Sequence, residues 1–322
     1  MDFWALRSFV TVAEQGSFTV AATRLRTTQP TLSRQVRSLE SELTVRLFDR
    51  LGRRVKLTRA GEELLARARG LLEEADSLKS RGRELAGGST GRLKVGATAQ
   101  TLESLVSPLL SRFRQAYPNA TVQLSEGGTT RLLNQVESGG LDVILATLPA
   151  GSTLRERPLF PSTAMAVMPL GHRLSARARI TIGDLQNEPL LLQRPGFMTR
   201  QLFEASCEAA RIQVRVLLES SSPHCLLALA DDGHGIAIVP STVRALNVGR
   251  KAIPLHHAGA PLSMWTSAIW NPKRYASPAR NAFINEAFQF TRRKYPGMEF
   301  HRGQLRTPKS KSTTERSTHV PC

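Results

Sequence analysis

Residues 16–37 read GSFTVAATRLRTTQPTLSRQVR, and this stretch decides how the N-terminal part of the chain folds. Gly16 and Ser17 mark a helix boundary, because glycine readily ends one helix and a serine hydroxyl caps the next. Thr28 is a natural N-cap for a further helix, and Pro30 stands in its first turn, where the missing N–H costs nothing. Two short helices joined by a brief polar break are therefore predicted, an arrangement typical of a helix-turn-helix.

The apolar spacing around this stretch predicts which faces pack together. A first amphipathic helix precedes Gly16, and its inward positions are Leu6, Phe9, Val10 and Ala13. The helix after Thr28 buries Leu32, Val36, Leu39 and Leu43, while Gln29 and Pro30 open it and its outward face carries Thr31, Ser33, Arg34 and Arg37. Glutamine and arginine suit base-edge reading because each can form a bidentate contact, with adenine and guanine respectively. Any amphipathic helix pair with surface arginines would share these features, so the pair alone leaves a purely structural role open.

Residues 48–57 predict a β-hairpin, or wing, directly after the helices. Its tip presents Arg53 and Arg54, which suit backbone phosphates or a narrow minor groove. Thr58 then caps a long helix whose heptad seam is Leu64, Ala68, Leu71, Ala75 and Leu78. Three heptads of this kind predict a dimer-forming linker helix, followed by a glycine-rich hinge at residues 87–91.

The charge of the chain points to an anionic partner but does not by itself locate the binding site. The 322 residues carry a formal net charge of +18. Residues 1–90 hold 16 Lys/Arg against 11 Asp/Glu, residues 91–290 hold 20 against 13, and residues 291–322 hold 8 against 2. The densest window is 24–59, with 10 bases and 3 acids, which coincides with the predicted helix-turn-helix and wing.

Compartment and redox chemistry follow from features that the sequence lacks. No apolar run reaches the length of a transmembrane helix, and the N-terminus has no signal-peptide pattern, so we expect a cytoplasmic protein. Three cysteines without CxxC spacing predict core or surface thiols rather than a metal or redox site. No Ser/His/Asp or paired-carboxylate arrangement and no phosphate-binding loop stands out, so we expect neither enzymatic activity nor a cofactor.

The N-terminal motifs together resemble the DNA-binding domain of LysR-type transcriptional regulators. The ordered blocks that carry the resemblance are LRSF at 6–9, GSFTVAA at 16–22, QPTLSRQV at 29–36, RLFDR at 46–50 and LTRAGE at 57–62. Thr44 departs from the family pattern, which usually has glycine after the recognition helix. Since glycine there permits a left-handed C-cap, Thr44 is expected to strain or reshape that turn without abolishing DNA binding.

The remaining two-thirds of the chain predicts an α/β architecture. Strands at 93–97, 121–126 and 141–146 alternate with helices at 101–117 and 129–137, which is a βαβαβ pattern with a parallel sheet. A second series follows, with strands at 164–168, 190–193, 214–218, 236–239 and 262–270 and helices at 199–211, 223–230 and 278–294. Two such lobes are similar to the periplasmic-binding-protein-like effector domain of the same family, and GHGIAIVP at 233–240 matches its late motif.

Ligands of two-lobed α/β domains bind between the lobes, where strand ends and helix N-termini converge. Thr98 follows the first strand and precedes a helix, so its hydroxyl suits a carboxylate, although ordinary N-capping explains it equally well. The resemblance implies that Thr129, Thr147, Gly196 and Phe197 face the same cleft. It also implies a small-molecule effector, here expected to be a small organic anion.

The resulting hypothesis divides the chain into a winged helix-turn-helix at 1–58, a linker helix and hinge at 59–90, an effector domain at 91–295 and a basic disordered tail at 296–322. The resemblance implies operator or promoter DNA, a homodimer or homotetramer and RNA polymerase as partners, with no membrane association. Two other readings stay open at this point. One is a cytoplasmic solute-binding protein that its N-terminal region dimerises, and the other is an enzyme on an α/β scaffold, which the missing catalytic residues disfavour.

Overall fold

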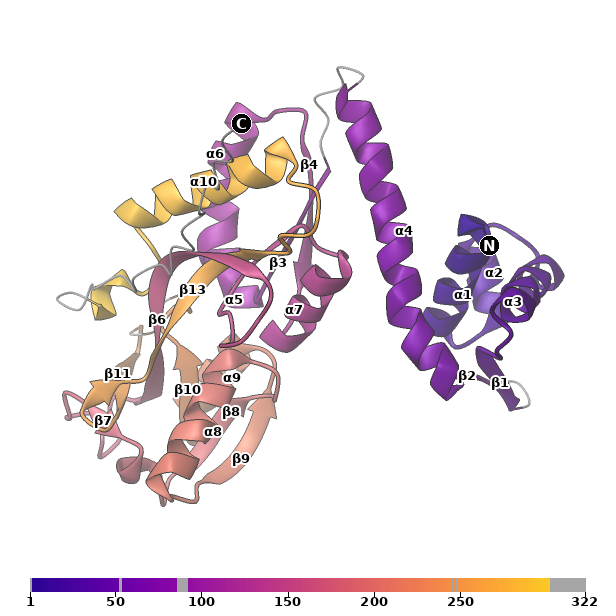
Figure 1. The fold of residues 1–322 in the computed structure, drawn as a ribbon. Helices are drawn as coiled ribbons and strands as arrows, with labels where there is room; N and C mark the ends of the chain where they lie inside the picture. Colours follow the sequence, from indigo (N-terminus) through magenta and orange to yellow (C-terminus); the bar gives the residue numbers. More distant parts are fainter. Residues whose placement is uncertain (1, 52–53, 86–91, 245, 247, 302–322) are drawn as a thin grey trace, which may run out of the picture.

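The computed structural model describes residues 2–51, 54–85, 92–244, 246 and 248–301. A helical N-terminal part with a β-hairpin leads into one long helix, which is followed by two α/β lobes (Figure 1). None of the helices within the described residues combines the length and apolarity that crossing a membrane requires. The glycine-rich hinge predicted at 87–91 and the chain after 301 lie outside the described residues.

The N-terminal part is the predicted winged helix-turn-helix. Its elements are α1 (Phe3–Gln15), α2 (Phe18–Arg24), α3 (Gln29–Leu43), β1 (Phe48–Leu51) and β2 (Arg54–Leu57). The predicted caps are present: Ser17 accepts from the Val20 N–H and Thr28 from the Thr31 N–H. Phe48 of the wing meets Phe9 and Phe18 edge to face, at centroid distances of 5.5 and 5.7 Å, so the hairpin is locked onto the helices by aromatic packing.

Thr44 occupies the left-handed turn that ends α3. Its φ is 56° and ψ is 26°, and its N–H bonds back to the carbonyls of Glu40 and Ser41. A β-branched residue pays a steric cost in this region that glycine avoids. Thr44 therefore adopts the left-handed C-cap conformation for which the family usually has glycine, and the cost is strain in its backbone.

The long helix α4 (Arg59–Leu85) uses only part of the predicted heptad seam inside its own chain. Ala68 is buried and Leu64 packs against the core of the winged helix-turn-helix. Leu71 and Leu78 lie exposed, at 48% and 74%. The second half of the seam thus presents apolar side chains that the described part of this chain does not cover.

The two lobes share one sheet whose strand order is β4-β3-β5-β13-β6-β10-β8-β9. The first lobe contains β3 (Arg92–Ala97), β4 (Thr121–Glu126), β5 (Val143–Ala146), α5 (Ala99–Thr101), the π-helical segment η1 (Leu102–Val106), α6 (Ser107–Ala116), α7 (Thr129–Ser138) and α10 (Pro278–Arg293). The second contains β7 (Ile180–Thr181), η2 (Gly183–Leu185), β8 (Pro189–Gln193), α8 (Met198–Ala210), β9 (Arg215–Ser220), α9 (Pro223–Asp231), β10 (Ile236–Pro240), β11 (Arg250–His257) and β12 (Ala260–Pro261). Within each lobe the central strands pair in parallel, as the βαβ pattern predicts.

Two long strands cross between the lobes. The first half of β6 (Arg155–Pro169) pairs antiparallel with β13 (Ser263–Trp270), and its second half pairs with β10 and β11. Thr163 and Ser263 face each other where the two strands pass from one lobe to the other, and their hydroxyls lie 2.6 Å apart. The sequence prediction began this strand at 164 and so missed the half that belongs to the first lobe.

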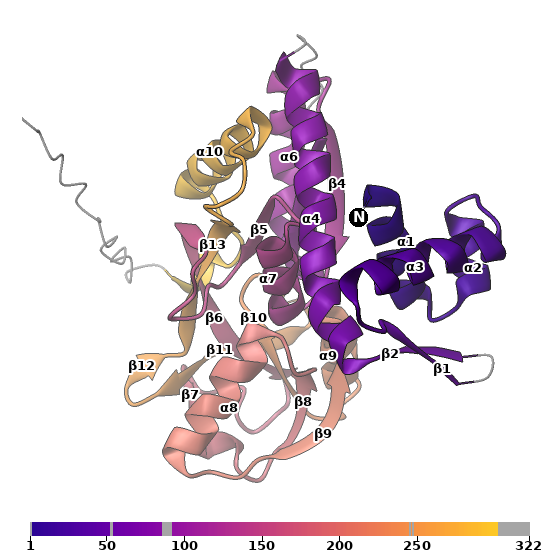
Figure 2. The ribbon, with the colours of Figure 1, turned by 45° about the vertical axis from the view of Figure 1, so that its right-hand side comes forward.

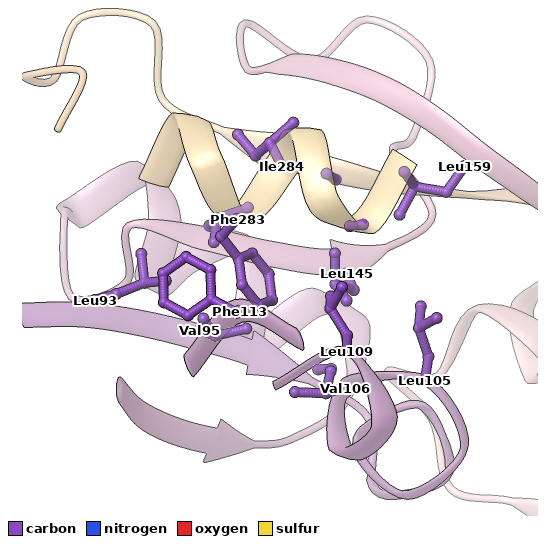
Figure 3. Packing of buried hydrophobic residues seen from close by; sticks show 14 of the residues in the cluster. Leu93, Val95, Leu105, Val106, Leu109, Phe113, Leu145, Leu159, Phe283 and Ile284 are labelled. Atoms are coloured by element: carbon purple, nitrogen blue, oxygen red, sulfur yellow. The ribbon is translucent and has the colours of Figure 1, made fainter. Parts of the chain in front are cut away.

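Each lobe has apolar cores on both faces of the sheet. In the first lobe α6 and α10 cover one face, where Phe113 and Phe283 meet edge to face at 5.7 Å (Figure 3). On the other face, Leu132 and Val136 of α7 pack with Ile144. Burial of these apolar surfaces stabilises the strands whose ends form the cleft.

The chain remains folded beyond residue 295, which corrects the predicted start of the disordered tail. Tyr295 stacks on Phe160 at 5.3 Å, and η3 (Met298–Phe300) follows it. His301 is buried, and its Nε2 lies 2.8 Å from the Thr163 hydroxyl. Residues 296–301 therefore pack against the crossing strands. The segment is too short to show a periodic apolar pattern in the sequence, which is why it was predicted as part of the tail.

Candidate functional site

The exposed face of α3 is the candidate DNA-reading surface. Gln29, Pro30, Arg34 and Arg37 lie exposed on it, and Thr31 is half-buried with its hydroxyl 2.8 Å from that of Thr28. Arg34 makes no hydrogen bond or ion pair with any residue that the structure describes. A free guanidinium at an exposed helix face is available for a bidentate contact with guanine or for a phosphate.

Ser33 differs from its predicted place on the outward face. The side chain is 3% exposed, and its hydroxyl accepts a hydrogen bond from Arg37 Nη2 at 3.2 Å. Helical geometry places Ser33 one residue from the inward Leu32, so it turns toward the core rather than toward solvent. Ser33 thus positions the Arg37 guanidinium and does not reach the surface itself.

The wing contributes backbone but no described side chains at its tip. Arg53 lies outside the described residues, and so does the side chain of Arg54. The hairpin register itself is described, with Phe48 opposite Leu57 and Leu51 opposite Arg54. The register therefore places Arg54 at the turn end of the hairpin, as the sequence predicted.

The second candidate site is a small cleft between the two lobes, with a volume of about 40 Å³. It is lined mainly by hydroxyl and amide side chains, together with a smaller apolar set of leucine, alanine, methionine, proline and phenylalanine. The polar lining residues are Thr98, Gln100, Thr101, Thr129, Thr147, Ser162, Gln193, Thr199, Thr242 and Thr266. Among the residues that the structure describes, no charged side chain joins this lining.

Four of the five predicted cleft residues line this cavity: Thr98, Thr129, Thr147 and Phe197. Thr98 is the N-cap of α5 but makes no side-chain capping bond within the described chain, and its hydroxyl instead lies 3.0 Å from that of Thr101. Gly196 does not line the cavity. Its carbonyl accepts a hydrogen bond from the Thr130 N–H at 3.2 Å, so it joins the two lobes at the rim.

Sequence reasoning missed the two glutamines of the cleft. Gln193 ends the apolar strand β8 and is 1% exposed, while Gln100 lies in α5 and is 5% exposed. Both polar side-chain atoms of Gln193 and the Oε1 of Gln100 have no hydrogen-bond partner among the described residues. The available signal was a single polar residue closing the apolar run Leu190–Leu192 at the carboxyl end of a parallel strand, where ligands bind.

Two sets of contacts hold the lobes together on either side of the cleft. On one side Gln201 Nε2 donates to the Thr130 hydroxyl at 3.4 Å, beside the Thr130–Gly196 bond. On the other side His224 Nε2 lies 2.8 Å from Glu103 Oε2. Ser222 caps α9, and His224 in the first turn of that helix joins the second lobe to the first.

Arg200, which follows the cleft residue Thr199, could pair with an anionic ligand, but its guanidinium already has protein partners. Its side chain is buried. It donates to Glu204 at 2.6 Å, to Glu219 at 2.8 Å and to the backbone carbonyl of Gln193 at 3.2 Å. Arg194 is exposed. Arg200 therefore holds the end of β8 in place and does not contribute its charge to the cleft.

Metal and thiol chemistry find little support in the described part of the chain. No group of three or more His, Cys, Asp or Glu side chains gathers there. Burial raises the pKa of the Cys207 thiol to about 11, so this thiol is protonated and unreactive near neutral pH. Cys225 is exposed, and Cys322 lies outside the described residues.

Comparison with known proteins places both parts of the chain in one family. Residues 3–62 match the family described as the bacterial regulatory helix-turn-helix protein, lysR family, and residues 86–291 match the LysR substrate binding domain. This chain is a LysR-type transcriptional regulator. It combines a DNA-binding domain with an effector-binding domain, as its sequence predicted.

Individual members of the LysR family are similar to this chain over nearly its whole length, in sequence and in structure. The HTH-type transcriptional regulator YybE of Bacillus subtilis is 30% identical over 284 residues, which cover 88% of this chain and 97% of YybE. A full-length OxyR variant from Pseudomonas aeruginosa has a TM-score of 0.65 at 27% identity, covering 89% of this chain and 97% of that structure. Full-length CbnR in complex with its target DNA has a TM-score of 0.64 at 25% identity, covering 90% and 100%.

In this LysR-type regulator the linker helix touches the effector domain through Arg274. Its guanidinium donates to the Ser138 carbonyl at 2.7 Å and to Glu74 at 3.1 Å, and it lies 3.6 Å from Glu73. The helices α4 and α7 pack side by side at this joint (Figure 2). Burial raises the pKa of Glu73 to about 7 despite the opposing effect of Arg274.

Proposed function

We propose that the exposed face of α3 reads operator DNA and that a small molecule in the interlobe cleft switches this activity. The observation that carries the DNA-reading assignment is the Arg34 guanidinium, which is exposed in the second turn of α3 and has no partner among the described residues. Arg37, which Ser33 holds in place, and the wing residues Arg53 and Arg54 supply further phosphate or groove contacts in this proposal.

The uncovered half of the linker seam supports a dimer. Leu71 and Leu78 are spaced by one heptad and are exposed, and a second copy of α4 would bury both. Dimerisation places two α3 helices on successive half-sites of one operator, and assembly through the effector domains completes the homotetramer that we propose. Contacts with RNA polymerase at a promoter and action in the cytoplasm, where the chromosome lies, belong to the same proposal.

We propose that each part of the chain has its own role, in the order of the sequence. Residues 1–58 read DNA, 59–90 connect and dimerise, and 91–301 bind the effector. The last part of the effector domain, 296–301, forms a C-terminal strap that packs against the crossing strands. Binding rather than catalysis is the role that suits the cleft, since its described lining consists of hydroxyls, amides and apolar groups and offers no acid or base for proton transfer.

The test is sequence selection from a randomised duplex library, followed by footprinting on the selected site. Wild-type protein should enrich one sequence, and Arg34→Ala should lose preference at one base position per half-site, by about 5- to 150-fold, the equivalent of the ~1–3 kcal/mol of a bidentate base contact. Arg114→Ala, which removes an exposed arginine on α6 of the effector domain, is the matched control and should select the wild-type sequence.

Unfolding curves of the three proteins should coincide, because Arg34 has no partner within the described residues whose loss would destabilise the fold. Selection of the same site with the same discrimination by Arg34→Ala would contradict the assigned reading face.

A further inference from the structure

Gln193 and Gln100 leave buried polar atoms that a ligand must satisfy. Gln193 is 1% exposed, and neither its Oε1 nor its Nε2 has a hydrogen-bond partner in the described chain, while Gln100 is 5% exposed and its Oε1 is likewise unpaired there. Both residues line the cleft. Since buried amides are almost always hydrogen-bonded, and leaving them unpaired is costly, three unsatisfied atoms around one cavity indicate the complement of a bound molecule.

The hydrogen-bonding roles of these atoms restrict the ligand. The two amide oxygens only accept, so the ligand must donate at least two hydrogen bonds, whereas Gln193 Nε2 donates and needs a ligand acceptor. A carboxylate accepts but cannot donate. Hydroxyl groups supply the donors, and the many threonine hydroxyls of the lining can pair with them in either direction.

The charge balance of the cleft restricts the ligand further. The helices α7 and α8 begin beside it, at the N-cap residues Gly128 and Phe197, and neither has a side-chain capping bond from the described residues. The Thr130 N–H of α7 already donates to the Gly196 carbonyl, and the other first-turn N–H groups of the two helices stabilise one negative charge. A second carboxylate would find no cationic side chain in the described lining, because Arg200 is already bound to Glu204 and Glu219. An ammonium group would find no carboxylate there.

We infer that the effector is a hydroxylated monocarboxylate, whose hydroxyl groups donate to Gln193 and Gln100 and whose carboxylate faces the N-termini of α7 and α8. This inference rests on the proposed function of the cleft and names the chemical class that it takes. A carboxylate with a neighbouring hydroxyl presents an acceptor and a donor side by side, which matches the two ends of the Gln193 amide. The volume of the cleft, about 40 Å³, suits a small molecule.

Two matched sets of probes test the class by calorimetry on the full chain. The six-carbon set is gluconate, hexanoate without the hydroxyls, sorbitol without the charge and glucarate with a second charge; the three-carbon set is glycerate, propionate, glycerol and tartronate. At neutral pH we expect gluconate or glycerate to bind at millimolar concentration or below and the other members of its set to bind at least about 100-fold more weakly, because a site built around polar partners rejects analogues that leave them unpaired.

Gln193→Leu tests the residue assignment. Leucine has a similar volume and its neighbours in β8 are leucines, so the ligand-free protein should be at least as stable as the wild type. Binding of the hydroxylated monocarboxylate should fall by about 10- to 100-fold. The same substitution at the exposed Gln186 of the second lobe is the control and should leave binding unchanged.

The inference is overturned if, in the set whose hydroxylated monocarboxylate binds, the analogue without hydroxyls, without charge or with a second charge binds equally well. It is also overturned if neither gluconate nor glycerate binds at millimolar concentration, or if Gln193→Leu binds as the wild type does. Sequence selection with the same protein preparation separates this failure from failure of the proposed function. An intact DNA preference that Arg34→Ala weakens at one base position per half-site, together with binding by the wrong probes, would reject only the ligand class.

Discussion

Glu73 offers the sharpest test of how the linker helix is joined to the effector domain. Its side chain is 19% exposed, and its Oε2 makes no hydrogen bond with the described residues. Burial raises its pKa from 4.5 to about 7, with Asp76 adding to the rise, while Arg274, Lys94 and Arg69 oppose it. We expect Glu73→Gln to strengthen the docking of α4 on the effector domain at pH 8 and to remove its pH dependence.

The sign and size of the pH effect on docking follow from the difference in the Glu73 pKa between the docked and the undocked helix. A carboxylate whose pKa is raised in the docked state binds its proton more tightly there, so docking is favoured at low pH and is weakened as the pH rises from about 4.5 through 7. A rise of this size corresponds to about 3 kcal/mol of docking free energy between acidic pH and pH 8. Glutamine carries no charge, so docking in the Glu73→Gln variant does not weaken as the pH rises.

Hydrogen exchange of the backbone amides of α4 around residue 73 and of residues 138–140, corrected for the intrinsic pH dependence, measures the docking. Wild-type protection should fall between pH 5 and pH 8, by up to about 100-fold for 3 kcal/mol. Glu73→Gln should hold its protection constant. Glu74→Gln is the matched control, because Glu74 also pairs with Arg274 but its side chain is 64% exposed. Wild-type protection that is constant or rises with pH, or a flattened profile in Glu74→Gln, would refute the reasoning.

Two further substitutions test the fold. Thr44→Gly should stabilise the DNA-binding domain by about 0.5–1 kcal/mol, because glycine relieves the cost of φ 56° at the end of α3, as measured by urea unfolding; a loss of stability would show that the Thr44 hydroxyl bond to the Leu43 carbonyl matters more. Phe113→Ala should destabilise the first lobe by about 3–5 kcal/mol, because it opens a cavity against Phe283, whereas the exposed neighbour change Arg114→Ala should cost less than ~0.5 kcal/mol in the same denaturant titration.

Local chemistry made the N-terminal fold predictable from sequence. The residues that begin and end α2 and α3 act through their own backbone neighbours: Ser17 and Thr28 cap, Gly16 adopts φ 61°, and Pro30 sits in the first turn. Most strands and helices of the two lobes were readable in the same way, because each apolar run belongs to one element, but β7, β11 and β12 were not among the predicted strands. The wing tip and the linker hinge, which the sequence also predicts, lie outside the described residues.

Features set by distant partners were not predictable in this way. The first half of β6 begins Arg-Glu-Arg-Pro and resembles a loop, yet it is a strand because β13 pairs with it across more than a hundred residues of sequence. Arg200 is buried where it pairs with Glu219 of the neighbouring strand β9. The strap at 296–301 is held by Thr163 and Ser241, where Gly297, at φ 79°, lies against the Ser241 backbone.

The helix α7 connects the cleft to the linker helix, so each can influence the other. The helix α7 touches both: Thr129 at its start lines the cleft, and Thr130 bonds to Gly196 of the other lobe. At its end the Ser138 carbonyl holds Arg274, which pairs with Glu73 and Glu74 of α4. A ten-residue helix moves as a unit, so a change in lobe closure that displaces Thr130 also displaces Ser138. A ligand that binds the closed cleft more tightly than the open one therefore alters the free energy of the α4 joint, and that joint carries the DNA-reading helix.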